Sequence, residues 1–308
     1  MYRAKAMGKA RHEMFDSTMH ARAVALLQLE TDLRKAIERT EFVLYYQPIV
    51  SLETGETIGF EALVRWQHPD RGLVSPAEFI PVAEETDLIV SVDRWVLGEA
   101  CRQMSAWQAR YPERPPLMIS VNFSSRQFLQ TDLTKQISQV LSESGLEAGY
   151  LKLEITERLI MEDVDSATRM LLQLRTLGVK VGIDDFGTGY SSLSYLHQFP
   201  IDTLKVDRSF VSRMGPNGEN SELVRTIVTL GQNLGLDLIA EGVETREQLT
   251  QLRTMGCNYG QGYYFSKPLD SEGATTLIAT APVWLMHDLP ATSNCIPSHS
   301  GPQTTNDR

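Results

Sequence analysis

The sequence predicts an α/β fold and, within that class, a (β/α)₈ barrel of the TIM type. Two observations lead to this prediction. From residue 42 onward, short β-rich runs alternate with amphipathic helical segments, and eight such runs are present. Several runs also end in an acidic or amide residue, which is typical of barrel strands that carry a functional site at their carboxyl ends. A doubly wound open sheet is the alternative, but it does not need eight strands.

The composition is that of an ordinary globular protein. The 308 residues are 42% hydrophobic and 22% charged, which excludes a disordered chain, a fibre and a disulfide-rich miniprotein. The net charge of −10 excludes binding of a nucleic-acid polymer by bulk charge. An anionic substrate remains compatible with this charge if metal ions lie between it and the carboxylates.

Three cysteines, Cys101, Cys257 and Cys295, are far apart in the sequence. They fit neither a disulfide framework nor a zinc site, and free thiols indicate a reducing compartment. The sequence has no run of about 18 apolar residues and no apolar signal core, so we expect no membrane segment and no secretion. The expected location is the cytoplasm, or the cytoplasmic part of a larger, possibly membrane-anchored, protein.

Two segments precede the barrel. Residues 1–16 form a short basic stretch, and residues 17–40 are predicted to form one helix that links this stretch to the barrel. The helix is predicted from apolar residues at helical spacing: Leu26, Leu29, Leu33 and Ile37. The barrel is expected to span 41–285, and the Pro/Ser/Thr/Asn-rich segment 286–308 is expected to be a disordered tail.

The barrel elements follow in order along the chain. The eight predicted strands lie near 43–50, 57–66, 118–123, 150–156, 179–184, 203–207, 236–241 and 259–265. Predicted helices lie at 93–109, 163–177 and 221–234, with another that starts at Thr245 in a capping box and ends at Gly256. The connection between the second and third strands is long, and extra helices are expected from Ser75-Pro76.

Acidic and amide residues recur where these strands end. The residues are Glu61, Asn122, Glu154, Asp184, Asp185 and Glu241. Asn122, Glu154 and Asp184 are 32 and 30 residues apart, which matches one strand-helix unit each, so we expect them to meet at the carboxyl mouth of the barrel. A single acid at a strand end more often caps the next helix, but Glu61, Asn122 and Glu154 lie among apolar neighbours, where an isolated carboxylate is costly to bury.

Converging carboxylates repel one another unless they are protonated or bind metal. An all-oxygen ligand set suits Mg²⁺ or Mn²⁺, and the number of ligands predicts two ions about 3.5–4 Å apart with Asp184-Asp185 as a bridge. Lys205 lies within the same set, where a cation can hold a water or stabilise developing charge; a simple salt bridge is the alternative. The Gly-rich stretch 184–192 is interpreted as a flexible loop that positions Asp185. The residues alone thus predict a soluble barrel enzyme that uses two divalent cations on a phosphate or carboxylate substrate.

At these positions the sequence resembles the EAL family of cyclic-di-GMP phosphodiesterases. The resemblance covers about residues 30–285 and is carried by ordered motifs. They are YYQPIV at 45–50, EALVRW from Glu61, VNFSSRQF at 121–128, LEITE at 153–157, GIDDFGTGYSSLSYL at 182–196, LKVDRSFV at 204–211, AEGVE at 240–244 and GCNYGQGYYFSKPL at 256–269.

The resemblance implies a modified barrel whose first strand runs antiparallel to the others. It implies hydrolysis of cyclic di-GMP to linear 5′-pGpG with two Mg²⁺ or Mn²⁺ ions, which lowers cyclic-di-GMP signalling. The metal ligands it implies are Glu61, Asn122, Glu154, Asp184, Asp185 and Glu241. It further implies that Lys205 holds or activates the attacking water, that Gln261 lies near that water and the phosphate, and that Glu157 anchors the DDFG loop.

The resemblance assigns substrate contacts as well. Gln47 and Arg65 resemble residues that contact the substrate, and Asp207 and Glu244 are assigned to the same site. A homodimer and upstream GGDEF or sensor domains are the partners expected, and residues 1–16 resemble the end of a GGDEF domain without its cyclase signature. Two alternatives are a cyclic-di-GMP receptor without turnover and a two-metal phosphoesterase with another substrate.

Overall fold

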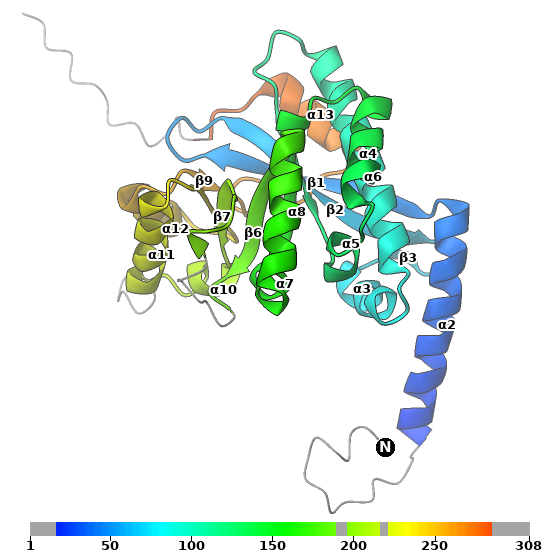
Figure 1. Cartoon of the computed structure of the whole chain (residues 1–308). Helices are drawn as coiled ribbons and strands as arrows, with labels where there is room; N and C mark the ends of the chain where they lie inside the picture. The colour runs from blue at the N-terminus through cyan, green and yellow to red at the C-terminus, as the bar shows by residue number, and fades with distance from the viewer. Residues whose placement is uncertain (1–16, 189–195, 216–220, 285–308) are drawn as a thin grey trace, which may run out of the picture.

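The computed structural model describes residues 17–188, 196–215 and 221–284 (Figure 1). Three parts of the predictions therefore lie outside the described residues: the segment 1–16, the segment 286–308 with Cys295, and the part of the Gly-rich stretch 184–192 that follows Thr188. In the described part, Cys101 and Cys257 are buried free thiols. None of the helices in this part combines the length and the hydropathy that a membrane-spanning segment requires.

Eight strands close into a barrel, as predicted (Figure 1). They are β1 (Phe42–Ser51), β2 (Thr57–His68), β4 (Met118–Asn122), β5 (Leu151–Thr156), β6 (Lys180–Phe186), β7 (Thr203–Val206), β8 (Asp237–Ala240) and β9 (Tyr259–Gly260). Within the barrel, β2 and the strands from β4 to β9 pair in parallel, whereas β1 pairs antiparallel with both β2 and β9 and so closes the barrel. The reversed first strand that the family resemblance implies is confirmed.

Two strand predictions need correction. Strand β3 (Gly72–Val74) was not predicted; it pairs antiparallel with the end of β2 as a short hairpin outside the barrel. The predicted last strand, 259–265, is reduced to the two residues of β9. It ends early because the chain turns at Gly262, whose carbonyl accepts the N–H groups of both Phe265 and Ser266.

Helices surround the barrel (Figure 1). They are α3 (Pro76–Glu85), α4 (Ile89–Arg110), α5 (Ser125–Phe128), α6 (Leu133–Ser144), α7 (Glu157–Glu162), α8 (Val164–Leu177), α10 (Arg208–Val211), α11 (Ser221–Asn233), α12 (Arg246–Met255) and α13 (Ser271–Thr280), with a 3₁₀ turn at Ala148–Tyr150. The four helices predicted at 93–109, 163–177, 221–234 and 245–256 form to within a few residues, and a helix begins at the expected Ser75-Pro76; the other helices were not predicted. The capping box at Thr245 forms with Gln248, and α3 begins with the predicted Pro76 at its first position. Helix α4 begins four residues before its predicted start.

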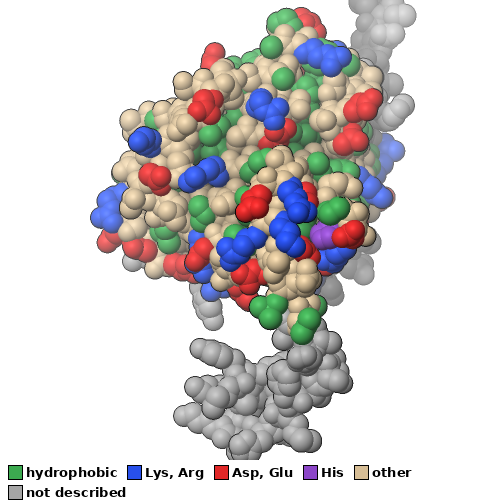
Figure 2. Space-filling view, turned by 90° about the vertical axis from the view of Figure 1, so that its right-hand side faces the viewer, with side chains coloured by type: hydrophobic (Ala, Val, Ile, Leu, Met, Phe, Trp, Pro, Cys, Tyr) green, Lys and Arg blue, Asp and Glu red, His purple; other side chains and the backbone are tan. Residues whose placement is uncertain are grey.

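Helix α2 (Ser17–Arg39) occupies the predicted linker position and extends away from the barrel (Figure 1). Its second half packs on the body of the protein through Leu29 and Leu33, which are buried. Leu26, which the apolar spacing placed in the same stripe, is 45% exposed because the helix has already left the body at that point. Figure 2 shows exposed apolar side chains at this end of the helix and interspersed acidic and basic side chains above it.

The strands place different side chains on the two sides of the barrel wall. In β5, Leu153 and Ile155 are buried among apolar side chains, whereas Glu154 between them points into the barrel, where it meets Lys205 of β7. Because successive strand residues alternate in direction, the same strands build an apolar layer under the helices and a charged layer inside the carboxyl mouth. That charged layer at the mouth is the candidate functional site.

Candidate metal-dependent active site

Lys205 lies at the centre of the carboxyl end of the barrel. Its side chain is fully buried, and its ammonium group contacts carboxylates from four other strands or their ends. The distances from Lys205 Nζ are 2.6 Å to Glu154 Oε2, 2.6 Å to Glu241 Oε1, 3.2 Å to Asp184 Oδ1 and 3.5 Å to Glu61 Oε2. Acids predicted to converge from their sequence spacing therefore meet around one lysine.

Amide side chains complete this layer around Glu61. Asn122 Nδ2 donates to Glu61 Oε1 at 2.6 Å, and Gln261 Nε2 donates to Glu61 Oε2 at 2.7 Å. The same Gln261 nitrogen also donates to Gln47 Oε1 at 2.9 Å, and Gln47 donates in turn to the carbonyl of Ser266. Both oxygens of Glu61 are thereby fixed, one by Asn122 of β4 and the other by Gln261 after β9, which Gln47 of β1 holds in turn.

The adjacent acids Asp184 and Asp185 lie at an irregular end of β6. The register with β7 shifts between Ile183 and Phe186, and Asp185 has a φ of 53°, which an aspartate adopts only at a cost of order 1–3 kcal/mol. Neighbouring residues of a regular strand point in opposite directions. The irregular backbone instead brings oxygens of Asp184, Asp185 and Glu241 within 4.8 Å of one another.

The charged layer perturbs the protonation of its members. Burial raises the pKa of both Glu154 and Glu241 above the ordinary 4.5. Burial disfavours the charge of Lys205, but the four carboxylates outweigh burial and raise its pKa. Burial and the neighbouring Asp184 raise the pKa of Asp185. The raised pKa values of Glu154, Asp185 and Glu241 mean that these three side chains favour a proton or a cation beside them.

The donor set fits divalent metal ions. Four carboxylates contact one buried ammonium group and Asp185 lies beside two of them, so the cluster carries excess negative charge that Lys205 alone does not balance. Glu154 Oε1 is buried and has no hydrogen-bond partner, which leaves one carboxylate oxygen free to bind an ion. Carboxylate and amide oxygens are the ligands that Mg²⁺ and Mn²⁺ prefer.

Glu157 and Asp207 support the loop that follows Asp185. Glu157 is buried and its Oε2 accepts the Gly187 N–H at 3.0 Å, which ties the first turn of α7 to the loop. Asp207 caps α10 by accepting the Ser209 N–H at 3.0 Å, and its carboxylate raises the pKa of Asp185. Glu157 therefore contacts the loop after Asp185, and Asp207 contacts the Asp185 side chain itself.

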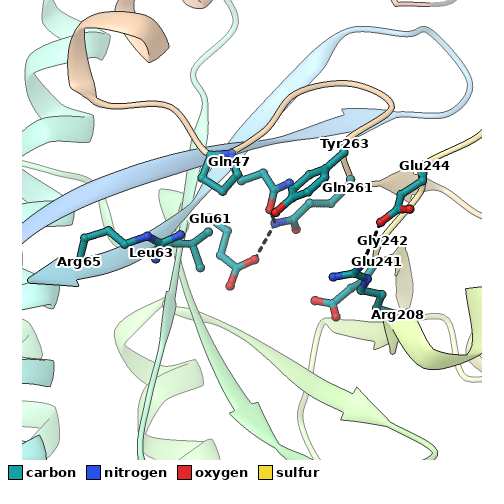
Figure 3. Close-up of a pocket in the computed structure, with 12 residues that line it drawn as sticks. Gln47, Glu61, Leu63, Arg65, Arg208, Glu241, Gly242, Glu244, Gln261 and Tyr263 are labelled. Carbon is teal, nitrogen blue, oxygen red and sulfur yellow. Dashed lines mark hydrogen bonds and ion pairs between the residues drawn. The ribbon is translucent and has the colours of Figure 1, made fainter. Parts of the chain in front are cut away.

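A pocket of about 260 Å³ opens beside the charged layer (Figure 3). Its floor includes Glu61, Glu241 and Gln261. The rest of its wall is formed by Gln47, Leu63, Arg65, Arg208, Gly242, Glu244, Gly262, Tyr263 and Pro268. A second cavity of about 230 Å³ reaches Asn122 and Glu154 from the side of α3 and α4, and it shares Leu63 and Arg65 with the first.

Three of the predicted substrate residues, Gln47, Arg65 and Glu244, line the first pocket. The fourth, Asp207, does not line it and instead caps α10. Arg65 lies over the Tyr45 ring, 5.6 Å from its centroid, and donates to the Val64 carbonyl. The sequence analysis did not assign Arg208 or Tyr263 to the site. Their only signal in the sequence is that each is close to a predicted site residue: Arg208 directly follows Asp207, and Tyr263 is two residues after Gln261.

Comparison with known proteins identifies the family. A family model described as the EAL domain matches residues 30–268. The chain belongs to the EAL family.

Among curated EAL relatives, the bifunctional diguanylate cyclase/cyclic di-GMP phosphodiesterase MucR of Pseudomonas aeruginosa is 43% identical over 279 residues, which are 91% of this chain and 40% of MucR. The cyclic di-GMP phosphodiesterase NbdA of the same organism is 41% identical over 269 residues, 87% of this chain and 34% of NbdA. The chain thus spans well under half the length of these relatives.

Solved EAL structures have the same fold. A structure described as the PaMucR phosphodiesterase in complex with c-di-GMP is 44% identical, with a TM-score of 0.77, and the match covers 80% of this chain and 99% of that one. The FimX EAL domain of Pseudomonas aeruginosa bound to c-di-GMP is 25% identical, with a TM-score of 0.71 over 79% of this chain and 96% of that one.

Proposed function

We propose that this EAL domain is a phosphodiesterase that hydrolyses cyclic di-GMP to linear 5′-pGpG. The observation that carries the proposal is the cluster around Lys205, in which acids from four parts of the barrel meet one buried ammonium group, and two of these acids, Glu61 and Glu241, line an open pocket. The names of MucR and NbdA, both described as cyclic di-GMP phosphodiesterases, support the same substrate.

Two Mg²⁺ or Mn²⁺ ions are the proposed cofactors, and Asp184, Asp185 and Glu241 are the acids whose oxygens lie close enough to share them. Glu61, Asn122 and Glu154 are proposed as the remaining ligands. When bound, the ions supply charge that attracts the phosphodiester and makes a coordinated water more acidic. This compensates for the acidic character of the site toward a dianionic substrate.

The chain's own residues position the reaction. Lys205 is held by four carboxylates, so its ammonium group stays in one place and can hold the attacking water or stabilise charge that develops on the phosphate. The Gln261 amide is fixed by Gln47 and Glu61 at the pocket wall, where it is proposed to orient the same water. Glu157 keeps the loop after Asp185 in place through the Gly187 N–H.

The proposal is tested by incubating the purified chain with cyclic di-GMP and Mn²⁺ or Mg²⁺ and separating the products by chromatography. We expect 5′-pGpG from the wild type and none from Glu61→Ala. Binding of cyclic di-GMP without product, in either metal, would instead make the domain a receptor. Cleavage of other phosphodiesters in preference to cyclic di-GMP would change the substrate but keep the metal assignment. The homodimer, the upstream GGDEF or sensor domains and the cytoplasmic location remain predictions.

A further inference from the structure

Two arginines, Arg65 and Arg208, line the pocket whose floor residues Glu61 and Glu241 contact the buried Lys205, and the two arginines differ in how they are held. Lys205 is held by four carboxylates beneath the pocket and does not line its wall, so it does not reach a second phosphate there. Arg65 is held against the Tyr45 ring and the Val64 carbonyl. Arg208 contacts only an exposed carboxylate among the contacts described, Glu244 Oε1, at 2.9 Å from its Nη2.

The backbone fixes where Arg208 lies. It is the first residue of α10, directly after Asp207, and its aliphatic stem lies on the backbone of Gly242. A Cβ at residue 242 would overlap the Arg208 Cβ and Cγ atoms, and Gly242 has a φ of +65°, so this close approach requires glycine. The guanidinium group is thereby presented beside Glu241, on the side of the pocket away from Arg65 (Figure 3).

The ion pair between Arg208 and Glu244 is suited to exchange. The two side chains are 62% and 43% exposed, and exposed ion pairs contribute only about 0–1 kcal/mol. A guanidinium group binds phosphate through two parallel N–H bonds, which is a stronger interaction than a water-screened carboxylate contact. A phosphate brought to this wall therefore displaces Glu244 at little cost.

We infer that Arg208 binds the phosphate of cyclic di-GMP that is not cleaved, and that it exchanges Glu244 for this phosphate when the substrate binds. The inference rests on the proposed function. The scissile phosphate belongs at the floor, where Lys205 and the metal-binding acids lie. The substrate carries a second phosphodiester with one negative charge, and Arg208 is a cation on the pocket wall whose existing partner is displaceable. Arg208 thus selects for a substrate with two phosphates.

The test compares two substrates and three variants. The substrates are cyclic di-GMP and bis(p-nitrophenyl) phosphate, which has one phosphodiester only. Arg208→Ala is expected to raise the KM for cyclic di-GMP by about tenfold to a hundredfold, the range for a hydrogen bond to a charged group, with little change in kcat. Turnover of bis(p-nitrophenyl) phosphate should not change. Arg208→Lys should recover part of the affinity, because it keeps the charge but loses the paired N–H bonds.

Arg225→Ala is the matched control, because Arg225 forms an exposed ion pair with Glu222 on α11, and it should leave both substrates unaffected. An unchanged KM in Arg208→Ala would overturn the inference. An equal loss on both substrates would also overturn it, because Arg208 would then act on the floor of the site. Thermal unfolding of each variant checks that the fold is intact.

Binding measurements separate this inference from the proposed function. Cyclic di-GMP affinity is measured with Mn²⁺ in a Lys205→Met background, where turnover is stopped, with and without Arg208→Ala. If the wild type proves to be a receptor, the proposed function fails, and a tenfold loss of affinity in Arg208→Ala still supports the phosphate contact. Equal affinity of the two proteins contradicts it whether or not the wild type turns over.

Discussion

The floor and the wall of the pocket use the same kind of interaction for different purposes. Lys205 and Glu154 at the floor are 2.6 Å apart and both side chains are fully buried. Arg208 and Glu244 on the wall are 2.9 Å apart, but their side chains are 62% and 43% exposed. Breaking a buried pair leaves an unpaired charge in a medium that solvates it poorly, whereas water replaces either partner of an exposed pair. Burial, not distance, makes the floor a fixed site and the wall an exchangeable one.

The largest effect is expected at the floor. Lys205→Met keeps the length of the side chain but removes the charge that four carboxylates share, so we expect at least about a 10³-fold loss of cyclic di-GMP turnover. Product formation by chromatography measures it. Lys180→Met is the control, because Lys180 on β6 pairs with Asp202 on the surface and its loss changes the net charge equally. Near-wild-type turnover in Lys205→Met would mean that the buried charge of Lys205 is not needed for turnover, and the contrast between the buried and the exposed ion pair would fail.

A smaller effect is expected behind the floor, at Glu157. Glu157→Ala removes the acceptor of the Gly187 N–H, so the loop after Asp185 loses its buried anchor. We expect turnover to fall by about tenfold to a hundredfold, in line with the cost of one hydrogen bond to a charged group. Glu157→Gln keeps an oxygen that can accept the same bond and should retain most of the rate. Equal losses in the two variants would mean that the charge, not the anchor, is required.

Without bound metal, the acidic cluster should make the free energy of unfolding depend on pH. Glu154 and Glu241 have raised pKa values in the folded protein, so their stabilising contribution is present below the ordinary 4.5 and is lost as pH rises through the folded values. Each such group changes the unfolding free energy by about 1.4 kcal/mol per pH unit in that range. The contribution of Lys205 is constant there, because its raised pKa lies above 10.5.

The melting temperature in EDTA is therefore expected to fall between about pH 5 and pH 8, and Mn²⁺ should reduce the fall because the ion replaces the protons. Burial raises the pKa of Asp93 to about 6, so Asp93 lowers the melting temperature with rising pH both in EDTA and in Mn²⁺. The difference between the two conditions therefore reports on the acidic cluster alone. Glu241→Gln should flatten the slope in EDTA. A slope that does not respond to Mn²⁺ would place the metal elsewhere.

The smallest effect is expected on the wall. Arg65→Ala removes a guanidinium group that is half buried over Tyr45, and we expect KM for cyclic di-GMP to rise by about tenfold with kcat nearly unchanged. Steady-state kinetics measure both quantities. Arg71→Ala, which removes an arginine from an exposed pair with Glu78, should change neither. A large fall in kcat in Arg65→Ala would mean that Arg65 acts in the chemical step and not only in substrate binding.

Much of the site could be predicted because its residues follow strand ends at regular intervals. Glu154 and Asp184 are one strand-helix unit apart, and in parallel strands such residues face the same mouth. The exposed wall could not be predicted in this way. Arg208 and Tyr263 lie in connections after strands, where no periodicity determines the direction of a side chain, and Arg208 reaches the pocket only because Gly242 lets its stem pass.

The sequence by itself determined the alternation of strands and helices, the capping box at Thr245 and the acids that meet at the barrel mouth, because each depends on local periodicity or on regular spacing. Only the tertiary structure decided the antiparallel pairing of β1, which the family resemblance implied, the short β9 and the irregular end of β6 that turns Asp185 toward Asp184. These features depend on partners far away in the chain. Their hydrogen bonds and burial form only when the barrel closes.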